Sequence, residues 1–454
     1  MHRPILNNHT TLVWFYFIIT LMIRSSLFRV SILLFLLANT AVRSQDSISQ
    51  TYRGNFEYGN FSTDLIFQIS NLQENPEVFF SSPEQNAYGI PAREVQIADD
   101  SIKFVLQSDF HRYQFHGKFF QDDLKLLLTV DNKSFPFALT RSDSDKGTQL
   151  KSRDVRFRSD RLLLYGTLYM PEKPNGRAIY LVTSSGDQDR SATRSEAMFF
   201  AKQGYVTLHT DKRGTGMSDG NWQTSSIPEL CQDDIRAITY LAETSNLRYA
   251  DIGIKGSSQG ASKVPYILSE IPEIGFGIIV SCPASSLLES DLNYWRNRNE
   301  GQLGSSDLLQ ATALQRSVFQ FIAGYISRDE LESQLSTKQN ESWISGVWVP
   351  ELESVQTDPK LGYTPLPYFN DLKQPILVIQ GGEDQIIPSN SLEKIEELTV
   401  NQNPRNRYLL LDHADHSMMF KGSSDFPYWN SLHPGYRPAL IEWMDHMNLK
   451  RKGK

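Results

Sequence analysis

The sequence predicts an α/β domain with a doubly wound, mostly parallel sheet, preceded by a small all-β domain. From residue 151 onward, short and almost continuously apolar runs alternate with amphipathic segments. Such alternation is typical of parallel strands that helices cover on both faces. Between residues 50 and 141, apolar residues instead recur with a period close to two and are separated by turn formers. That pattern is typical of short antiparallel strands.

The composition describes a folded globular protein. Hydrophobic residues make up 40% and charged residues 21% of the 454 residues. The net charge of -7 gives no reason to expect a nucleic-acid partner. Cys231 and Cys282 are too few for a disulfide framework, and no Cys/His spacing suggests zinc. We expect two buried free thiols, with a single disulfide as the alternative.

The first 44 residues are expected to form a secretory signal. Arg24 and Arg29 precede an apolar run at residues 30–38, and a small-residue region follows it. This is the layout of a signal peptide, which predicts an exported protein, periplasmic or extracellular. Met22 is an alternative start. The alternative is that residues 1–44 are not cleaved and anchor the protein in a membrane, in which case this segment is the expected membrane contact.

The all-β domain is predicted from four short runs with period-two character, at residues 64–69, 101–106, 112–115 and 125–130. Their spacing predicts a small antiparallel sandwich or half-barrel over residues 50–141. No residue in it is a catalytic candidate. Residues 142–150 are polar and are expected to be a linker to a catalytic domain at residues 151–454.

The α/β domain is expected to begin with an antiparallel pair at residues 155–157 and 162–170. Further strands are predicted at residues 178–182, 206–209, 252–255, 276–281, 376–380 and 408–411. In open sheets of this kind, the chemistry lies at the carboxyl ends of the strands. The residues that follow each strand are therefore the candidates for the site.

A nucleophile candidate follows the strand at residues 252–255. The sequence there reads Gly256-Ser257-Ser258-Gln259-Gly260, and a helix-compatible segment comes next. This is the layout of a nucleophile elbow, in which a sharp strand-to-helix turn presents one serine above the sheet. The spacing of the two glycines selects Ser258 over Ser257.

Acid and base candidates follow the last two strands. Glu383 and Asp384 come after residues 376–380, and His413 and His416 come after residues 408–411. The residues alone do not separate the members of either pair. A serine hydroxyl needs a base to take its proton, and a carboxylate fixes the tautomer of that base. The order serine, carboxylate, histidine along the chain is the one expected for a nucleophile on such an elbow.

Two other loops follow strands of this sheet. Residues 183–190 are placed to give a backbone N–H to an oxyanion hole. Asp211 and Arg213 lie in a glycine-rich loop that we interpret as a structural turn held by charge-assisted hydrogen bonds. A phosphate-binding loop is disfavoured because the Gly-Lys-Ser/Thr ending is missing.

With these residues in place, the chain resembles the α/β-hydrolase superfamily, and within it bacterial serine carboxylesterases with a small β-rich domain before the catalytic one. Matching features lie at residues 81–85, 187–190, 211–214 and 433–436, and at Trp443. The resemblance implies Ser258 as nucleophile. It implies Asp384 as the acid, because the family's aspartate lies four residues before a proline. It implies His416 as the base, because a small and then a bulky apolar residue follow it.

The resemblance also implies two backbone oxyanion donors, the N–H of Gln259 and that of Ser185. The family's first loop usually reads His-Gly-Ser-Gly, whereas this one reads Thr183-Ser184-Ser185-Gly186. A backbone donor survives a change of side chain, but the missing first glycine is expected to change the loop dihedrals. One lost donor costs about 100- to 1,000-fold in turnover, so low activity or an unusual acyl group is expected.

Residues 290–367 form an insertion before the acid-bearing strand. Helices are predicted at residues 307–327 and 329–336. We expect a helical cap over the mouth of the site that sets acyl-group preference. The alternative is a helical embellishment packed elsewhere.

The sequence therefore predicts a carboxylesterase that cleaves a small-molecule ester through an acyl-enzyme, without metal or cofactor. One alternative is a serine peptidase or thioesterase with the same triad. The other is a catalytically silent, ligand-binding protein, which the altered loop at residues 183–186 motivates.

Overall fold

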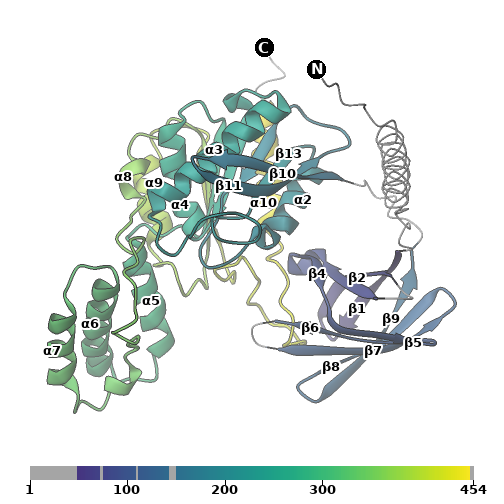
Figure 1. The fold of residues 1–454 in the computed structure, drawn as a ribbon, viewed down its shortest axis with the longest axis horizontal. Coiled ribbons are helices and arrows are strands. Elements are labelled where there is room, and N and C mark those ends of the chain that lie inside the picture. Colours follow the sequence, from purple (N-terminus) through teal and green to yellow (C-terminus); the bar gives the residue numbers. More distant parts are fainter. Residues whose placement is uncertain (1–48, 72–74, 109–110, 143–149, 450–454) are drawn as a thin grey trace, which may run out of the picture.

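The computed structural model describes residues 49–449, apart from residues 72–74, 109–110 and 143–149. It shows a β-rich domain, an α/β domain and a helical lobe (Figure 1). The predicted signal at residues 1–44 and most of the predicted linker lie outside the described residues. Within the described ranges, none of the helices has the length and apolar character needed to cross a membrane.

The β-rich domain is one antiparallel sheet of nine strands, in the order β4-β3-β2-β1-β9-β8-β7-β6-β5. The strands are β1 (Gln50–Tyr58), β2 (Phe61–Ser70), β3 (Glu77–Ser82), β4 (Ala87–Pro91), β5 (Arg93–Ala98), β6 (Ser101–Gln107), β7 (Arg112–Phe120), β8 (Asp123–Val130) and β9 (Lys133–Arg141). The two edge strands, β4 and β5, are joined through Ala92 alone, so the sheet curls until it is nearly closed. The half-barrel prediction is therefore confirmed and the sandwich prediction is wrong.

The core of this domain lies inside the curled sheet. In β8, Leu124, Leu126 and Leu128 point inward and are buried, whereas Lys125 and Leu127 point outward. This alternation follows from the two-residue period of a strand and is what made β8 visible in the sequence. Most of the remaining core is aromatic, and two of its side chains, Phe426 and Trp429, come from the α/β domain.

The α/β domain has an eight-stranded sheet in the order β10-β11-β13-β12-β14-β15-β16-β17. Its strands are β10 (Lys151–Ser159), β11 (Leu162–Met170), β12 (Ala178–Leu181), β13 (Val206–Thr210), β14 (Ile252–Ser257), β15 (Phe276–Val280), β16 (Ile376–Gly381) and β17 (Arg407–Leu411). The β10–β11 and β11–β13 pairs are antiparallel, as predicted for the first two strands, and the other pairs are parallel.

Helices cover both faces of this sheet, so the doubly wound prediction is confirmed. One face packs against α3 (Ile227–Ser245), α4 (Gln259–Glu270), α8 (Leu366–Phe369) and α9 (Ser391–Thr399). The other packs against α2 (Arg194–Lys202) and α10 (Tyr436–Leu449). Helix α3 begins at a capping box, in which Ser226 and Glu229 satisfy each other's backbone N–H groups. Cys231 and Cys282 are free and buried, as predicted.

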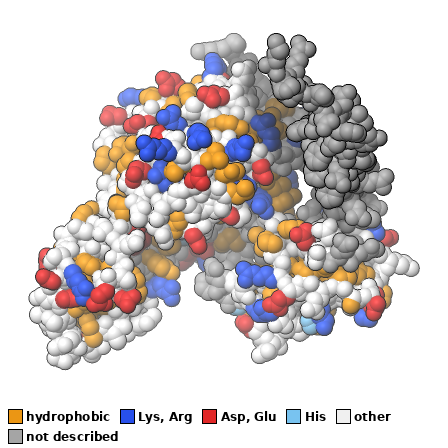
Figure 2. Space-filling model, in the orientation of Figure 1, with side chains coloured by type: hydrophobic (Ala, Val, Ile, Leu, Met, Phe, Trp, Pro, Cys, Tyr) orange, Lys and Arg blue, Asp and Glu red, His pale blue; other side chains and the backbone are white. Residues whose placement is uncertain are grey.

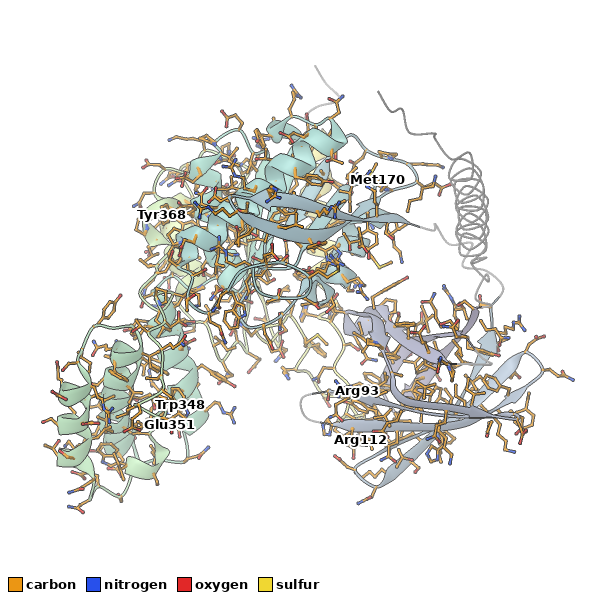
Figure 3. All side chains as sticks on the ribbon, viewed as in Figure 1. Arg93, Arg112, Met170, Trp348, Glu351 and Tyr368 are labelled. Atoms are coloured by element: carbon orange, nitrogen blue, oxygen red, sulfur yellow. The ribbon has the colours of Figure 1, made fainter. Side chains whose placement is uncertain are left out.

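The insertion forms a helical lobe that projects from the α/β domain (Figure 1). Its helices are α5 (Leu287–Asn299), α6 (Ser305–Ile322) and α7 (Arg328–Lys338), and they share a small core around Val318 and Trp343. The two predicted helices are thus present as α6 and α7. Trp348 lies on this lobe with 53% of its surface exposed (Figure 3). That the lobe covers the mouth of the site stays a prediction.

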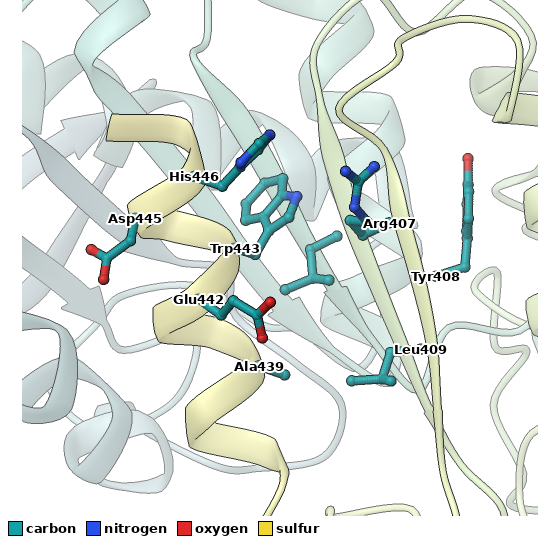
Figure 4. A pocket seen from close by; sticks show the side chains of 9 residues that line it. Arg407, Tyr408, Leu409, Ala439, Glu442, Trp443, Asp445 and His446 are labelled. Atoms are coloured by element: carbon teal, nitrogen blue, oxygen red, sulfur yellow. The ribbon is translucent and has the colours of Figure 1, made fainter. Parts of the chain in front are cut away.

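Two features of the surface complete the fold. Figure 2 shows acidic and basic side chains interspersed over the visible faces of the α/β domain and the helical lobe. A pocket of about 490 Å³ lies between the edge strand β17 and α10, where Arg407 and Trp443 are among the lining residues (Figure 4). It adjoins the first half of β17, away from the carboxyl ends of the parallel strands.

Candidate active site

Ser258 sits at a strained turn between β14 and α4. Its backbone has φ 56° and ψ -125°, a conformation that L-residues other than glycine rarely adopt. A Cβ at Gly256 would contact the backbone of Gly260, and a Cβ at Gly260 would lie 3.1 Å from the Val182 and Thr183 carbonyl oxygens. The two glycines therefore permit the tight turn, which explains their spacing around Ser258.

The three residues expected to form the triad lie together. The Ser258 Oγ is 2.9 Å from His416 Nε2, and His416 Nδ1 is 2.9 Å from Asp384 Oδ2. A carboxylate only accepts, so Nδ1 carries the proton and Nε2 is left to accept from the serine hydroxyl. Because β14, β16 and β17 run in the same direction, their carboxyl ends bring the three residues to one edge of the sheet.

Asp384 is fixed from behind by the backbone. Its Oδ1 accepts hydrogen bonds from the N–H groups of Ile386 (2.8 Å) and Ile387 (3.0 Å), and its side chain has no exposed surface. Both hydrogen bonds satisfy an oxygen that is buried away from water. The loop of His416 is shaped by Asp415, whose Oδ1 accepts from the N–H groups of Ser417 and Met419 at 2.9 Å each.

The structure separates the candidates that the sequence left paired. His413 and Glu383 lie beside each other, with Nδ1 and Oε1 3.7 Å apart, but both side chains are more than half exposed. Neither makes a hydrogen bond with Ser258 among the described residues. Ser257 Oγ instead accepts from Lys255 Nζ at 2.6 Å. The geometry thus favours Asp384, His416 and Ser258 over their sequence neighbours.

The two expected oxyanion donors have no competing partner. Among the described residues, neither the Gln259 N–H nor the Ser185 N–H donates to a protein acceptor. Gln259 is the first residue of α4, where backbone N–H groups are unpaired and the helix dipole favours negative charge. Ser185 lies in an exposed position of the loop after β12.

The altered first loop is held by side chains. Ser184 Oγ donates to the Ser257 carbonyl at 2.9 Å and lies 3.4 Å from the Gly260 N–H. Thr183 Oγ1 accepts from Lys263 Nζ at 2.7 Å. These residues replace the His-Gly pair of the resembling family. Ser184 adds a hydrogen bond from the loop to the elbow, and Thr183 adds one to helix α4.

Behind Thr183 lies a fully buried ion pair. Lys263 Nζ and Asp234 Oδ2 are 2.6 Å apart, and the two side chains are 0% and 1% exposed. Asp234 Oδ1 also accepts from the Tyr180 hydroxyl at 2.6 Å and from the Thr183 hydroxyl at 3.2 Å. Burial and the adjacent Asp234 raise the pKa of Tyr180 well above its usual value, so this hydroxyl stays a donor.

A second lysine holds the far end of the loop. Lys212 Nζ donates to the Ser184 carbonyl at 2.8 Å and to the Gly186 carbonyl, so it brackets Ser185. The ammonium also lies 4.4 Å from the centroid of the Trp222 ring. Burial, followed by the positive charges of Lys263 and Lys360, lowers the pKa of Lys212 to about 7.

The glycine-rich loop after β13 is structural, as interpreted from the sequence. Asp211 Oδ1 accepts from the Arg190 N–H and Oδ2 from the Met217 N–H, at 2.9 and 3.0 Å. Arg213 forms a two-pronged pair with Asp233 of α3, at 2.5 and 2.9 Å. This turn carries Lys212, and it therefore places the ammonium against the first loop.

Sequence reasoning missed Lys212, Lys263 and Asp234 as neighbours of the site. One signal was present: Lys263 interrupts an apolar helix face at a position that the period of α4 predicts to be buried. The other two residues carry no local signal, because their partners lie far away in the sequence.

The family comparison agrees with this geometry. The model of the X-Pro dipeptidyl-peptidase family (S15) matches residues 133–418, which is more than half of the chain. The matched range contains Ser258, Asp384 and His416. No curated protein matches the chain.

Solved structures show more distant likenesses. An esterase from Pyrococcus furiosus is 18% identical, with 67% of this chain and 94% of that chain covered and a TM-score of 0.43. An α/β hydrolase from Penicillium sp. sh18 is 16% identical, with 66% and 98% covered and a TM-score of 0.41. A puromycin hydrolase is 14% identical, with 78% and 48% covered and a TM-score of 0.41.

The resemblance to the α/β-hydrolase superfamily is thus confirmed. The family match, the doubly wound sheet and the elbow after β14 agree on this assignment. The chain belongs to the X-Pro dipeptidyl-peptidase (S15) family of the α/β-hydrolase superfamily and is a hydrolase-type enzyme.

Proposed function

We propose that the protein is a serine hydrolase that cleaves carboxylic esters through an acyl-enzyme, with Ser258, His416 and Asp384 as its triad. The observation that carries the proposal is the continuous chain of hydrogen bonds from Ser258 Oγ through the imidazole to the buried carboxylate. Each link has the polarity that nucleophile activation needs.

In the first half of the reaction, Ser258 Oγ bonds to the ester carbonyl carbon and its proton moves to His416 Nε2. The carbonyl oxygen takes the negative charge, which the N–H groups of Gln259 and Ser185 are proposed to bind. The bond to the alcohol oxygen then breaks. The proton on Nε2 passes to that oxygen, and the alcohol leaves.

In the second half, His416 Nε2 takes a proton from water while the water oxygen bonds to the acyl carbon. The bond from that carbon to Ser258 Oγ breaks, and the proton returns to Oγ as the carboxylic acid leaves. Asp384 stabilises the imidazolium in both halves and holds its orientation. It keeps its negative charge throughout.

The side chains around the first loop suit this role for Ser185. Lys212 fixes the carbonyls on either side of Ser185, and Ser184 ties the loop to the end of β14. A preorganised backbone N–H is worth most when it need not reorient during the reaction. This supports activity despite the missing His-Gly pair, and it argues against a silent protein.

A serine peptidase is the second candidate, because the matching family model is that of X-Pro dipeptidyl peptidases. The same steps cleave an amide when the leaving group is an amine. We place esters first because an alcohol leaves more readily than an amine and because the sequence resembles carboxylesterases. The thioesterase alternative uses the same steps with a thiol as the leaving group.

The helical lobe is proposed to set acyl-group preference. Asn293 and Asn297 of α5 donate to the carbonyls of Ile386 (3.1 Å) and Gln385 (2.8 Å), directly after Asp384. The lobe is therefore attached to the loop that carries the acid. The exposed Trp348 ring is proposed to contact the acyl group of a substrate when the lobe lies over the site.

The test is a substrate panel of nitrophenyl esters of increasing chain length, X-Pro anilides and acyl thioesters. We expect the esters to give the highest kcat/KM, with Ser258→Ala as the control that removes turnover. Turnover of the anilides alone would replace the esterase by a peptidase. Full activity of the Ser258→Ala variant would overturn the mechanism.

A further inference from the structure

The segment that follows the catalytic histidine loop enters the other domain. We call residues 420–432 the tether. It leaves the α/β domain four residues after His416, reaches the curled sheet and returns to α10 (Figure 1). Its tip buries Phe426 and Trp429, which are 0% and 6% exposed, in the aromatic core of the β-rich domain.

The tip is packed as core, not as a surface contact. The Phe426 ring lies 4.8 Å from Phe56 and 5.0 Å from Phe135, centroid to centroid. The Trp429 ring lies 5.0 Å from Phe56. Aromatic pairs at these separations add to the area that they bury. The β-rich domain therefore completes its core with two side chains of the catalytic domain.

Hydrogen bonds fix the same tip. Asn60 and Asp425 form a reciprocal pair, in which each backbone N–H donates to the other side chain at 2.8 Å. The Tyr113 hydroxyl donates to the Tyr428 carbonyl at 2.8 Å. Gly59 has φ +57°, and a Cβ there would run into Asp425, so glycine is needed for this close approach.

The base of the tether is joined to the histidine loop. Backbone N–H groups of Lys421 and His433 donate to the carbonyls of His413 (2.5 Å) and Met418 (2.7 Å), on either side of His416. The N–H of Phe420 donates to Ser431 at 2.8 Å and closes the base. The position of His416 is thus connected through a short, hydrogen-bonded segment to the core of the β-rich domain.

We infer that the β-rich domain is a positioning module for the catalytic base, with Phe426 and Trp429 as positioning residues that act through the His416 loop. The inference rests on the proposed role of His416. The α/β domain holds the inner side of the His416 loop, where the Ser281 hydroxyl donates to the His416 carbonyl at 2.8 Å. The outer side of the loop is exposed, and two of its residues, His413 and Met418, are left-handed, so its own backbone preferences do not fix it. The tether adds a constraint through the carbonyls of these two residues.

The test compares Phe426→Ala with Phe67→Ala in the full chain. Both phenylalanines are 0% exposed in the same core, but the rings packed against Phe67 are Phe80, Phe104 and Phe115, none of which belongs to the tether. We expect Phe426→Ala to lower kcat on the order of 100-fold, with KM changed much less, because a displaced base slows the chemical step. Phe67→Ala should keep most of its kcat, and Trp429→Phe should recover most of the loss seen with Trp429→Ala.

An equal loss of kcat in the two alanine variants would overturn the inference, because loss of the β-rich core would then be the cause. If Phe426→Ala does not fold, Asn60→Ala decides. Asn60 lies in the β-rich domain, and the substitution removes two exposed side-chain hydrogen bonds to the tether, one to the Ser423 carbonyl and one from the Asp425 N–H. A several-fold fall in kcat supports the inference, and an unchanged kcat overturns it.

The labelling rate of Ser258 by a fluorophosphonate separates this inference from the proposed function. Unlabelled wild-type protein would contradict the triad itself. Wild type and Phe426→Ala labelled at equal rates would contradict the positioning role alone.

Discussion

The buried ion pair of Lys263 and Asp234 contributes both to the stability of the α/β domain and to the position of the first loop. Variants of this pair can distinguish the two contributions. Replacing Asp234 by alanine leaves the Lys263 ammonium, which is 0% exposed, without its carboxylate. Loss of one partner of a buried pair destabilises a protein by about 3–5 kcal/mol. At about 2–4 °C per kcal/mol, the melting temperature should fall by about 6–20 °C.

The double variant Asp234→Leu with Lys263→Met removes both charges, retains an unbranched chain in place of the lysine and repeats the branching of the aspartate side chain. Replacing a buried pair by apolar residues is often neutral or stabilising, so the melting temperature should return close to that of wild type. The kcat should not return, because Thr183 loses the hydrogen bonds that both residues make to its side chain. Removing one oxyanion donor lowers kcat by about 100- to 1,000-fold, and this sets the upper limit for the effect of displacing the donor.

The assay is thermal unfolding of the three proteins together with their kcat on a nitrophenyl ester. If the Asp234→Ala variant melts within about a degree of wild type, the reasoning about the buried charge is refuted. A double variant that regains both stability and kcat would refute the role of this pair in holding the first loop.

Three further predictions follow from the site. Because the folded pKa of Lys212 lies near 7 and its usual value is 10.5, the unfolded chain binds more protons between these values, so stability from this group is gained as pH rises through that window. The difference in unfolding free energy between wild type and Lys212→Met should therefore increase from about pH 7 to about pH 9, by at most about 1.4 kcal/mol per pH unit. Denaturant titrations measure this difference, and a value that does not change with pH would contradict the prediction. His416→Ala and Asp384→Asn should each lower kcat on the order of 10,000-fold, whereas His413→Ala and Glu383→Gln should stay close to wild type; the reverse pattern in steady-state kinetics would exchange the roles. Replacing both Asn293 and Asn297 by alanine should change the preferred ester chain length more than the maximal rate, and an unchanged chain-length profile would remove the lobe from substrate selection.

Periodicity explains why much of the fold was predictable. Strands buried on one face, such as β8, show their two-residue alternation, and strands buried on both faces, such as β14 and β16, appear as apolar runs. The strands missed in the β-rich domain include β4 and β5. Both lie at the edges of the sheet, and most of their residues are at least partly exposed, which weakens the pattern.

The predicted strand ends and the glycine spacing predicted part of the site. They identify Ser258 as the nucleophile, and they limit the candidates for the acid and for the base to two neighbouring residues each. The choice between Glu383 and Asp384 depends on which side chain the turn after β16 buries against the N–H groups of Ile386 and Ile387, and composition does not show this. The family resemblance selected the residues that the structure brings together.

Long-range contacts were outside the reach of the sequence. Lys212 meets the first loop 26 and 28 positions away, and Asn60 meets Asp425 across 365 positions. Such pairs leave no periodic trace on either partner. The tether shows the same difficulty, since Phe426 and Trp429 stand in an irregular segment whose burial depends wholly on the other domain.

The most direct measurement for the proposed triad is fluorophosphonate labelling of the folded protein, followed by mass spectrometry of the peptide that contains residues 256–260. The proposed mechanism predicts one phosphonyl group on Ser258 Oγ, which Ser258→Ala and His416→Ala each abolish. Labelling of Ser257, labelling that persists in Ser258→Ala, or no labelling of the folded wild type would contradict it.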